Sequence, residues 1–416
     1  MRFIIVSFIL FIIDLYVFRA IRTHTSELNN YLKYTIYILF WLLPIILLSA
    51  WLYYKLYPGQ IDFRSSKLFL FMGAFFVVFT LPKLIIFSFQ LIDDFSKLAA
   101  FLLKKFSTPD ELLYRNAEKI SRSDFISRLA LIISAVPFLA SIYGIVAGRF
   151  NFNVVKKTLS FTKLPASFDG FKIVQFSDLH IGSLAGHKDQ LEKAIDLINE
   201  QKPDVIFFTG DMVNNIATEL DGWEKTLSKL SAKHGVFSVL GNHDYGEYFP
   251  WDNEEDKQAN IQSLKNRQKN MNFNLLLNDN RIIGKNGEQI AIVGVENWGN
   301  PPFPQYGNLQ KALEKTENVP FKLLLSHDPT HFDMQVAGKE DIALSFSGHT
   351  HGMQFAINFG GISWSPVKWK YKKWRGLYQH KNNEQYLYVN IGLGYIGFPG
   401  RVGTDPEITV IELKKA

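Results

Sequence analysis

The chain has 416 residues, too many for one ordinary domain, which predicts two or three structural units. Hydrophobic residues make up 47% and charged residues 20%, with a mean hydropathy of +0.00, so a very apolar part is expected beside a soluble part. The chain has no cysteine, which excludes disulfides and thiolate metal sites. The formal charge of +6 is interspersed with acidic residues rather than gathered in a basic tract.

Residues 1–150 are predicted to form a transmembrane helical domain. Four apolar runs are each long enough to cross a hydrocarbon core of about 30 Å as a helix. No small-residue cleavage site follows the first run, which argues against a signal peptide. We therefore predict an integral membrane protein with about four spans, at about residues 3–20, 34–57, 68–92 and 129–148.

Two charged residues, Asp14 and Lys83, lie inside these apolar runs, where an unpaired charge is costly. We interpret them as a structural pair, or Lys83 as a side chain that reaches the interface beside Pro82. A transport or relay role is the alternative.

The distribution of Lys and Arg predicts the topology. If the N-terminus lies outside, ten Lys and Arg residues face the cytoplasm and eight lie on the opposite side. This distribution favours an arrangement in which both the N-terminus and the C-terminal part lie outside the cytoplasm. Residues 121–126 also resemble a twin-arginine export signal in which Ser123 replaces the second arginine.

Residues 151–416 are predicted to form a layered α/β domain, because strand-length apolar runs alternate with amphipathic helices. A strand pair is expected at 164–176 around the turn Asp169-Gly170. Further strands are expected at 205–209, 235–240, 275–277, 289–295, 321–325, 386–390 and 408–413. Helices are expected at 188–201, 222–230, 253–270 and 309–317.

Polar residues that suit metal binding directly follow several of these apolar runs. An aspartate after one strand is a weak signal, because such residues often cap helices. An ordered series is stronger, because the carboxyl ends of neighbouring parallel strands meet at one edge of a sheet. The series is Asp178 and His180, then Asp211, then Asn242, His243 and Asp244, then His327, and finally His349 and His351.

This series resembles the calcineurin-like metallophosphoesterase superfamily over about residues 159–413. The resemblance implies an α/β/β/α sandwich that holds two divalent metal ions of the Mn, Fe or Zn type. It implies that Asp178, His180 and His351 hold the first ion. Asp211 would bridge the two ions, and the second would be held by Asn242, His327 and His349.

The resemblance also implies a mechanism. A hydroxide shared by the two ions would attack phosphorus in line. His243 would contact the phosphate and stabilise the leaving oxygen, and Asp244 would orient it or serve as a cap. Gly241 and Gly348 would let the backbone turn tightly beside the site.

The residues around these motifs bear on the substrate. Asn214 and Asn215 stand where phosphoprotein phosphatases of the superfamily have an acidic residue and an arginine, which argues against a Ser/Thr protein phosphatase. The glycine-rich tail 388–408 resembles the membrane-associated bacterial branch, which is similar to phosphodiesterases and to UDP-2,3-diacylglucosamine pyrophosphatases. Arg401 in that tail is expected to contact phosphate. Met353 departs from the branch, which usually has glycine there.

One stretch, residues 364–375, interleaves Trp and Tyr with Lys and Arg. That mixture suits lipid headgroups at a bilayer surface. It also suits nucleic acid, and an edge strand with solvent-facing lysines is a third interpretation. Because the chain is tethered to a bilayer, we favour lipid and expect no nucleic-acid partner.

Together these observations predict a metal-dependent phosphodiesterase or pyrophosphatase anchored in the bacterial inner membrane, with an extracytoplasmic catalytic domain. The expected partners are the lipid bilayer and a phosphoester substrate that is lipid-linked or a nucleotide-lipid. Two alternatives remain: a nucleotide phosphodiesterase that is merely tethered, and a membrane sensor whose metallophosphoesterase domain only binds. The sequence carries no signal for an oligomeric state.

Overall fold

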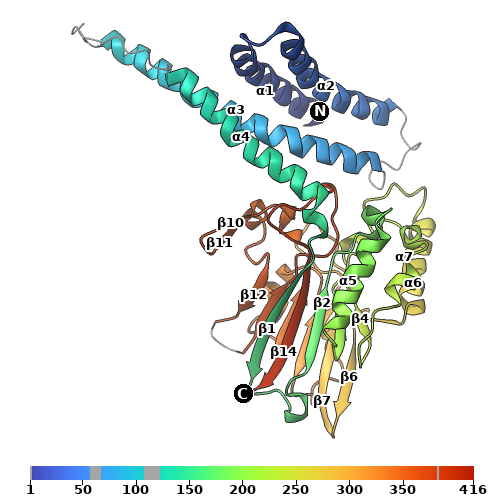
Figure 1. Ribbon diagram of the computed structural model, residues 1–416. Helices are drawn as coiled ribbons and strands as arrows, with labels where there is room; N and C mark the ends of the chain where they lie inside the picture. The colour runs from blue at the N-terminus through green and yellow to red at the C-terminus, as the bar shows by residue number, and fades with distance from the viewer. Residues whose placement is uncertain (1, 57–66, 107–121, 382–383) are drawn as a thin grey trace. The chain divides into compact units, whose positions relative to one another are not determined.

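The computed structural model describes residues 2–56, 67–106, 122–381 and 384–416 (Figure 1). The chain divides into two compact units. One is a helical unit, with described residues 2–56, 71–106 and 122–143. The other is an α/β unit, with described residues 67–70, 144–381 and 384–416.

The described residues of the helical unit form four helices. They are α1 Arg2–His24, α2 Asn30–Leu56, α3 Lys67–Phe106 and α4 Arg122–Val146. Within the described residues, Leu70–Leu103 and Arg122–Phe150 are long and apolar enough to cross a membrane, and Asn30–Ile46 is a shorter apolar helix. The helix α3 continues well past the predicted end of its span, and Pro82 lies inside it. The number of helices that cross the bilayer stays a prediction.

The charges inside the apolar runs pair with each other. Lys83 Nζ of α3 lies 2.5 Å from Asp14 Oδ1 of α1, and both side chains are almost buried. The ammonium group also lies 4.3 Å from the centre of the Phe40 ring of α2. Asp14 and Lys83 therefore form the predicted pair, which links α1 to α3.

The α/β unit contains two six-stranded sheets and a separate two-stranded hairpin. The first sheet has the order β1-β14-β2-β3-β4-β5. In it β2 to β5 are parallel, and β14 runs parallel to β1 and antiparallel to β2. The bounds are β1 Asn153–Phe161, β2 Lys172–Phe176, β3 Val205–Phe208, β4 Val236–Ser238, β5 Phe273–Leu275 and β14 Glu407–Lys415.

The second sheet has the order β12-β13-β9-β8-β7-β6. Its four central strands are parallel, and its edge strands β6 and β12 are antiparallel to their neighbours. The bounds are β6 Asp279–Lys285, β7 Glu288–Gly294, β8 Lys322–Leu325, β9 Leu344–Ser347, β12 Gly376–Gln379 and β13 Tyr386–Val389. The hairpin is made of β10 Ile357–Phe359 and β11 Ile362–Trp364.

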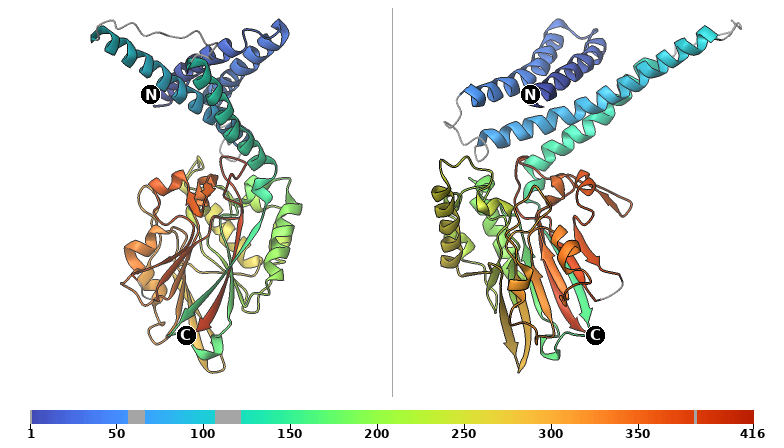
Figure 2. Two further views of the ribbon diagram at one scale, coloured as in Figure 1. Left: turned by 60° about the vertical axis from the view of Figure 1, so that its left-hand side comes forward. Right: turned by 180° about the vertical axis from the view of Figure 1, so that it is seen from behind.

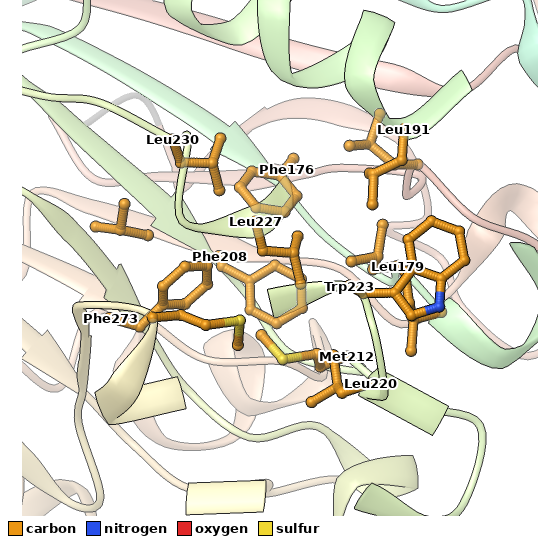
Figure 3. Close-up of a cluster of buried hydrophobic side chains, with 14 of the residues drawn as sticks. Phe176, Leu179, Leu191, Phe208, Met212, Leu220, Trp223, Leu227, Leu230 and Phe273 are labelled. Carbon is orange, nitrogen blue, oxygen red and sulfur yellow. The ribbon is translucent and has the colours of Figure 1, made fainter. Parts of the chain in front are cut away.

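Helices cover the outer face of each sheet, as two views show (Figure 2). Buried side chains between the sheets, among them Phe207 and Phe346, form one core. A second core packs the first sheet against α5 Lys188–Glu200, α6 Glu224–Leu227 and α7 Glu254–Asn270 (Figure 3). A third lies beneath α8 Leu309–Leu313. These four layers confirm the predicted α/β/β/α sandwich.

The structure corrects several predicted elements. The strand expected at 275–277 lies at Phe273–Leu275, and the helices expected at 222–230 and 309–317 are shorter, at Glu224–Leu227 and Leu309–Leu313. Residues 164–176 do not form a strand pair, because 166–168 make a short 3-10 turn and only Lys172–Phe176 is a strand. The true first strand is β1, which pairs with β14, more than two hundred residues away in the chain. Such distant pairing leaves no local pattern from which the partner could be predicted.

Candidate metal centre

The predicted ligands lie at one edge of the two packed sheets, just past the ends of their strands. In the first sheet, residues 178 and 180 follow β2, 211 follows β3 and 242 follows β4; these three strands are parallel neighbours. In the second sheet, residue 327 follows β8 and residues 349 and 351 follow β9, again parallel neighbours. Strand order thus brings together seven side chains that are far apart in the sequence.

The first ligand group consists of Asp178, His180 and His351, whose side chains are buried and whose ligand atoms all lie within 4.8 Å of one another. His351 Nε2 lies 3.2 Å from Asp178 Oδ1 and 3.0 Å from His180 Nε2. The two imidazoles therefore direct the same nitrogen toward one point beside a carboxylate.

The second ligand group consists of Asp211, His327 and His349, within the same mutual distance of 4.8 Å. His327 Nε2 lies 3.2 Å from Asp211 Oδ2, and His349 Nδ1 lies 3.3 Å from His327 Nε2. The amide oxygen of Asn242 lies 2.8 Å from His349 Nδ1, so Asn242 faces the same point.

Asp211 lies between the two groups. Its Oδ2 is 3.2 Å from His327 Nε2 in the second group and 3.6 Å from His180 Nε2 in the first. Its other oxygen accepts a hydrogen bond from the backbone N–H of His243 at 2.9 Å. A carboxylate in this position can contact ions in both groups.

The hydrogen bonds of two histidines fix which nitrogen faces the site. His327 donates from Nδ1 to the Thr209 carbonyl oxygen at 2.7 Å, which leaves the Nε2 lone pair for a ligand. His349 Nε2 lies 2.7 Å from the Tyr371 hydroxyl, which leaves Nδ1 beside Asn242. Imidazole nitrogens with carboxylate and amide oxygens suit a divalent ion of the Mn, Fe or Zn type, so the residues fit the implied metals.

The electrostatics of the two groups keep both of their carboxyl groups charged. Burial disfavours the charged form of Asp178, but the interaction with the neighbouring His351 favours it. The net result is that the pKa of this carboxyl lies below its usual range. The pKa of Asp211 is lowered in the same way, with His327 the largest opposing influence after burial. Burial lowers the pKa of His349 to about 4, which keeps that ring neutral and able to act as a ligand.

Asp244 stabilises the backbone of the loops that carry Asp211 and Asn242. Its carboxylate accepts backbone hydrogen bonds from Gly241 and Asp211 at 2.9 Å and from Met212 at 2.8 Å. Burial and the charge of Asp211 raise the pKa of Asp244 to about 7, against these donors. Asp244 is therefore not the partner of His243, whose Nδ1 instead donates to the Asn214 carbonyl oxygen at 2.7 Å.

Arg401 departs from the expectation that it contacts phosphate. Its side chain is fully buried, and it does not line the cavity described below. The guanidinium group donates to the carbonyl oxygens of Ile391, Gly394 and Thr404, at 2.6 to 3.0 Å. Nη2 also lies 3.4 Å from His351 Nδ1. In this position Arg401 holds the glycine-rich loop against the first ligand group.

A cavity of about 460 Å³ opens onto both groups. His243, the predicted contact to phosphate, lines it together with Asp211, Asn242, His349 and His351. The other walls include Tyr248, Phe303, Lys370 and Tyr371. These four were not predicted as site residues, because they come from loops that carry no strand-end motif; only the aromatic and basic composition of 364–375 drew attention to the last two.

Comparisons with known proteins agree with this fold. The family model for calcineurin-like phosphoesterases matches residues 171–353, and the model for the transmembrane domain of such phosphoesterases matches residues 1–149. The chain therefore belongs to the calcineurin-like phosphoesterase family and has an N-terminal transmembrane domain.

Three relatives illustrate the similarity. The uncharacterized metallophosphoesterase YkuE of Bacillus subtilis is 34% identical over 62% of this chain and 84% of its own length. The uncharacterized metallophosphoesterase Cj0846 of Campylobacter jejuni is 27% identical over 100% of this chain and 99% of its own length. A zebrafish transmembrane protein with a metallophosphoesterase domain is 28% identical over 69% of this chain, and the match spans 62% of that protein.

Proposed function

We propose that the protein is a membrane-anchored phosphoester hydrolase that uses two divalent metal ions. The observation that carries this proposal is the convergence of two ligand groups on Asp211 at the floor of one cavity. Two metal ions bound there would supply a nucleophile at neutral pH and Lewis-acid stabilisation of the phosphoryl oxygens.

The chain's own residues take distinct parts in this proposal. Asp178, His180 and His351 hold one ion, and Asn242, His327 and His349 hold the other, with Asp211 shared. His243 binds substrate: its Nδ1 is engaged by the Asn214 carbonyl oxygen, which leaves Nε2 to contact a phosphoryl or leaving-group oxygen in the cavity.

For the substrate we propose a phosphodiester or pyrophosphate bond in a lipid-linked or nucleotide-lipid molecule at the bacterial inner membrane. The transmembrane domain supports this, because it keeps the site close to lipid. The cavity supports it as well, because apolar and aromatic walls stand beside the polar ligands, and the Lys370 side chain suits a second anionic group.

A tethered nucleotide phosphodiesterase is the second candidate. The rings of Tyr248, Phe303 and Tyr371 in the cavity wall favour it, because aromatic side chains can stack on a nucleobase. Turnover of lipid pyrophosphates and of cyclic nucleotides by the same detergent-solubilised protein separates the two. The larger kcat/KM identifies the substrate class.

The direct test uses the full chain in detergent with Mn²⁺ and bis-p-nitrophenyl phosphate. We expect hydrolysis, and we expect Asp211→Asn to lower kcat by about a hundredfold or more, because loss of the shared carboxylate weakens both ions at once. Bound metal, measured by elemental analysis, should fall with it. Asp341→Asn is the control, because that carboxylate is exposed and pairs with Lys163. Absence of turnover with any divalent ion would favour a domain that only binds.

A further inference from the structure

The catalytic unit exposes an unusual amount of hydrophobic side chain in one segment. Among the described residues of 151–416, six of the nine exposed large hydrophobic side chains lie between 353 and 369. The four most exposed are Phe359 at 85%, Trp369 at 82%, Ile362 at 73% and Ile357 at 65%. We call these four side chains together with Trp364 the hairpin surface. Exposed apolar groups gathered in this way mark an interaction site more often than isolated ones do.

The register of the hairpin places its apolar side chains on one face. Ile357 pairs with Trp364 and Phe359 pairs with Ile362, whereas Asn358 pairs with Ser363. Because side chains alternate along a strand, the first two pairs share a face and the polar pair points the other way. Ser363 Oγ donates to Asn358 Oδ1 at 2.7 Å on that polar face. The hairpin is therefore amphipathic, with its apolar face toward solvent.

The tip of the hairpin stands clear of the rest of the described unit. The turn consists of Gly360 and Gly361, and a Cβ added at either would meet nothing within 4 Å. Only the base is held, by hydrogen bonds from Ala356 N to the Val402 oxygen and from Asn358 Nδ2 to the Gly403 oxygen, both 2.8 Å. Two views show the hairpin projecting from the unit (Figures 1 and 2). An isolated two-stranded hairpin is marginal in water, so an apolar partner would stabilise it.

The charge next to the hairpin surface has a single sign. Residues 352–380 include Lys368, Lys370, Lys372, Lys373 and Arg375 and no Asp or Glu. Lys373 pairs with Asp333, but Lys368, Lys370 and Lys372 are exposed and form no ion pair among the described residues. Trp369, in the same turn, packs its ring 5.6 Å from that of Trp364. Aromatic and apolar groups beside cations match an anionic bilayer surface.

We propose that the hairpin surface inserts into the headgroup region of the membrane that holds the transmembrane domain. A second copy of the chain is a poorer partner, because it would bring an equally cationic segment against this one. Lys370 and Tyr371, which continue the same segment, line the catalytic cavity, so a docked hairpin would bring the cavity wall to the headgroups. The insertion itself does not depend on the proposed hydrolase activity.

The absence of cysteine makes a depth measurement direct. The full chain carrying Phe359→Cys is labelled with a nitroxide and reconstituted in nanodiscs of phosphatidylglycerol and phosphatidylcholine. Asn286→Cys is the control, because Asn286 is exposed in the β6–β7 turn at the far end of the same unit (Figure 1). We expect oxygen to relax the Phe359 label while a water-soluble nickel chelate does not, at a depth of about 5–10 Å. The control label should respond to the chelate.

Two results would overturn the proposal. In one, the labels at 359 and 286 respond equally to the chelate, which would leave the hairpin in water. In the other, the label at 359 is shielded from both reagents and shows spin–spin broadening, which would identify a second copy as the partner.

Activity gives an independent readout that rests on the proposed function. The triple variant Ile357→Ser, Phe359→Ser, Ile362→Ser should hydrolyse soluble bis-p-nitrophenyl phosphate like the unmodified chain. Its turnover of a bilayer-embedded phosphodiester should fall by about tenfold or more, because the loss of even one of its three apolar contacts would give about that factor. Ile282→Ser, on exposed β6, is the matched control. Equal turnover of the embedded substrate by both variants would count against insertion, whereas an inactive parent would count against the hydrolase and leave the label depth as the test.

Discussion

Five of the seven proposed metal ligands hold a left-handed backbone. Their φ angles lie between 44° and 74° in Asp178, His180, Asp211, His349 and His351. For residues other than glycine this conformation costs about 1–3 kcal/mol each and persists only where the surroundings fix it. Backbone hydrogen bonds fix it here, for example from Asp178 N to the Gly210 oxygen and from His180 N to the Asp211 oxygen. The left-handed conformation changes the chain direction sharply just after each strand, at the residues proposed to bind metal.

Gly348 is required for a different reason from the tight turn expected of it. A Cβ at this position would lie 1.8 Å from Ser177 Oγ and 2.3 Å from Asp178 Oδ2, so glycine is needed because the carboxylate of this proposed ligand approaches the backbone. We therefore expect Gly348→Ala to displace Asp178 and to lower the metal content per chain, measured by elemental analysis. Gly284→Ala is the control, because a Cβ there meets nothing within 4 Å. Equal metal content in the two variants would contradict this account.

For single residues, the sequence shows the chemical type of a side chain but not where the fold places it. The ordered series of Asp, Asn and His after apolar runs was visible in the sequence, and its resemblance to a known family implied the proposed ligand set. Arg401 was assigned to phosphate because its charge is visible in the sequence, whereas its burial against three carbonyl oxygens is not. The composition of residues 364–375 drew attention to the segment that holds Tyr371, but its contact with His349 was not predictable, since that contact depends on the path of a loop.

At the scale of elements, each proposed ion draws ligands from both sheets. The first combines the loop after β2 with the loop after β9, and the second combines the loops after β3 and β4 with those after β8 and β9. The packing of the two sheets therefore decides whether either group can assemble. The core between them, which includes Phe207 and Phe346, supports the metal centre from a distance.

Asp244 ties together the loops that follow β3 and β4. Asp244→Ala would leave the N–H groups of Gly241, Asp211 and Met212 without this acceptor. Because each buried unpaired donor costs about 1–3 kcal/mol, we expect a loss of about 3 kcal/mol or more in the free energy of unfolding. Urea titration of the intact chain in detergent, followed by tryptophan fluorescence, measures it.

The matched control for this change is Asp341→Ala, an exposed aspartate that forms a surface ion pair with Lys163. It should shift the urea midpoint little, because such pairs contribute about 0–1 kcal/mol. If the Asp244 variant unfolds at the same urea concentration as this control, the proposed tie between the two loops is not a significant source of stability.

Central elements were predicted more accurately than peripheral ones. The strands β3, β8 and β13 are buried apolar runs, and α5 buries Leu191, Ile195 and Ile198 at helical spacing, so local pattern sufficed. The strands β1, β6, β10, β11 and β12 were not predicted. They lie at sheet edges or in the hairpin, where mixed polar and apolar residues give no clear period and the partner strand decides the structure.

For the whole molecule, the topology of the membrane domain decides which substrates the site can meet. We predict that the catalytic unit lies outside the cytoplasm, from the excess of cationic residues in the loops assigned to the inside. Because the chain has no cysteine, Asn286→Cys in intact cells reports the side directly. It should react with a membrane-impermeant maleimide without permeabilisation.

Glu27→Cys is the companion variant for this measurement. Glu27 is exposed between α1 and α2, in a loop assigned to the cytoplasm, so it should react only after the cells are permeabilised. The reverse pattern, with Glu27→Cys labelled in intact cells and Asn286→Cys protected, would place the catalytic unit inside the cytoplasm.

The order of strands in the first sheet has a consequence for biosynthesis. The strand β14, Glu407–Lys415, lies between β1 and β2, although those two strands leave the ribosome some two hundred residues earlier. The sheet therefore stays divided during translation, and His349 and His351 also emerge late, so neither ligand group is complete until these residues have been made. A nascent chain already threaded into the bilayer would therefore complete its two ligand groups only after residue 351 had emerged, and its first sheet only after β14 had followed.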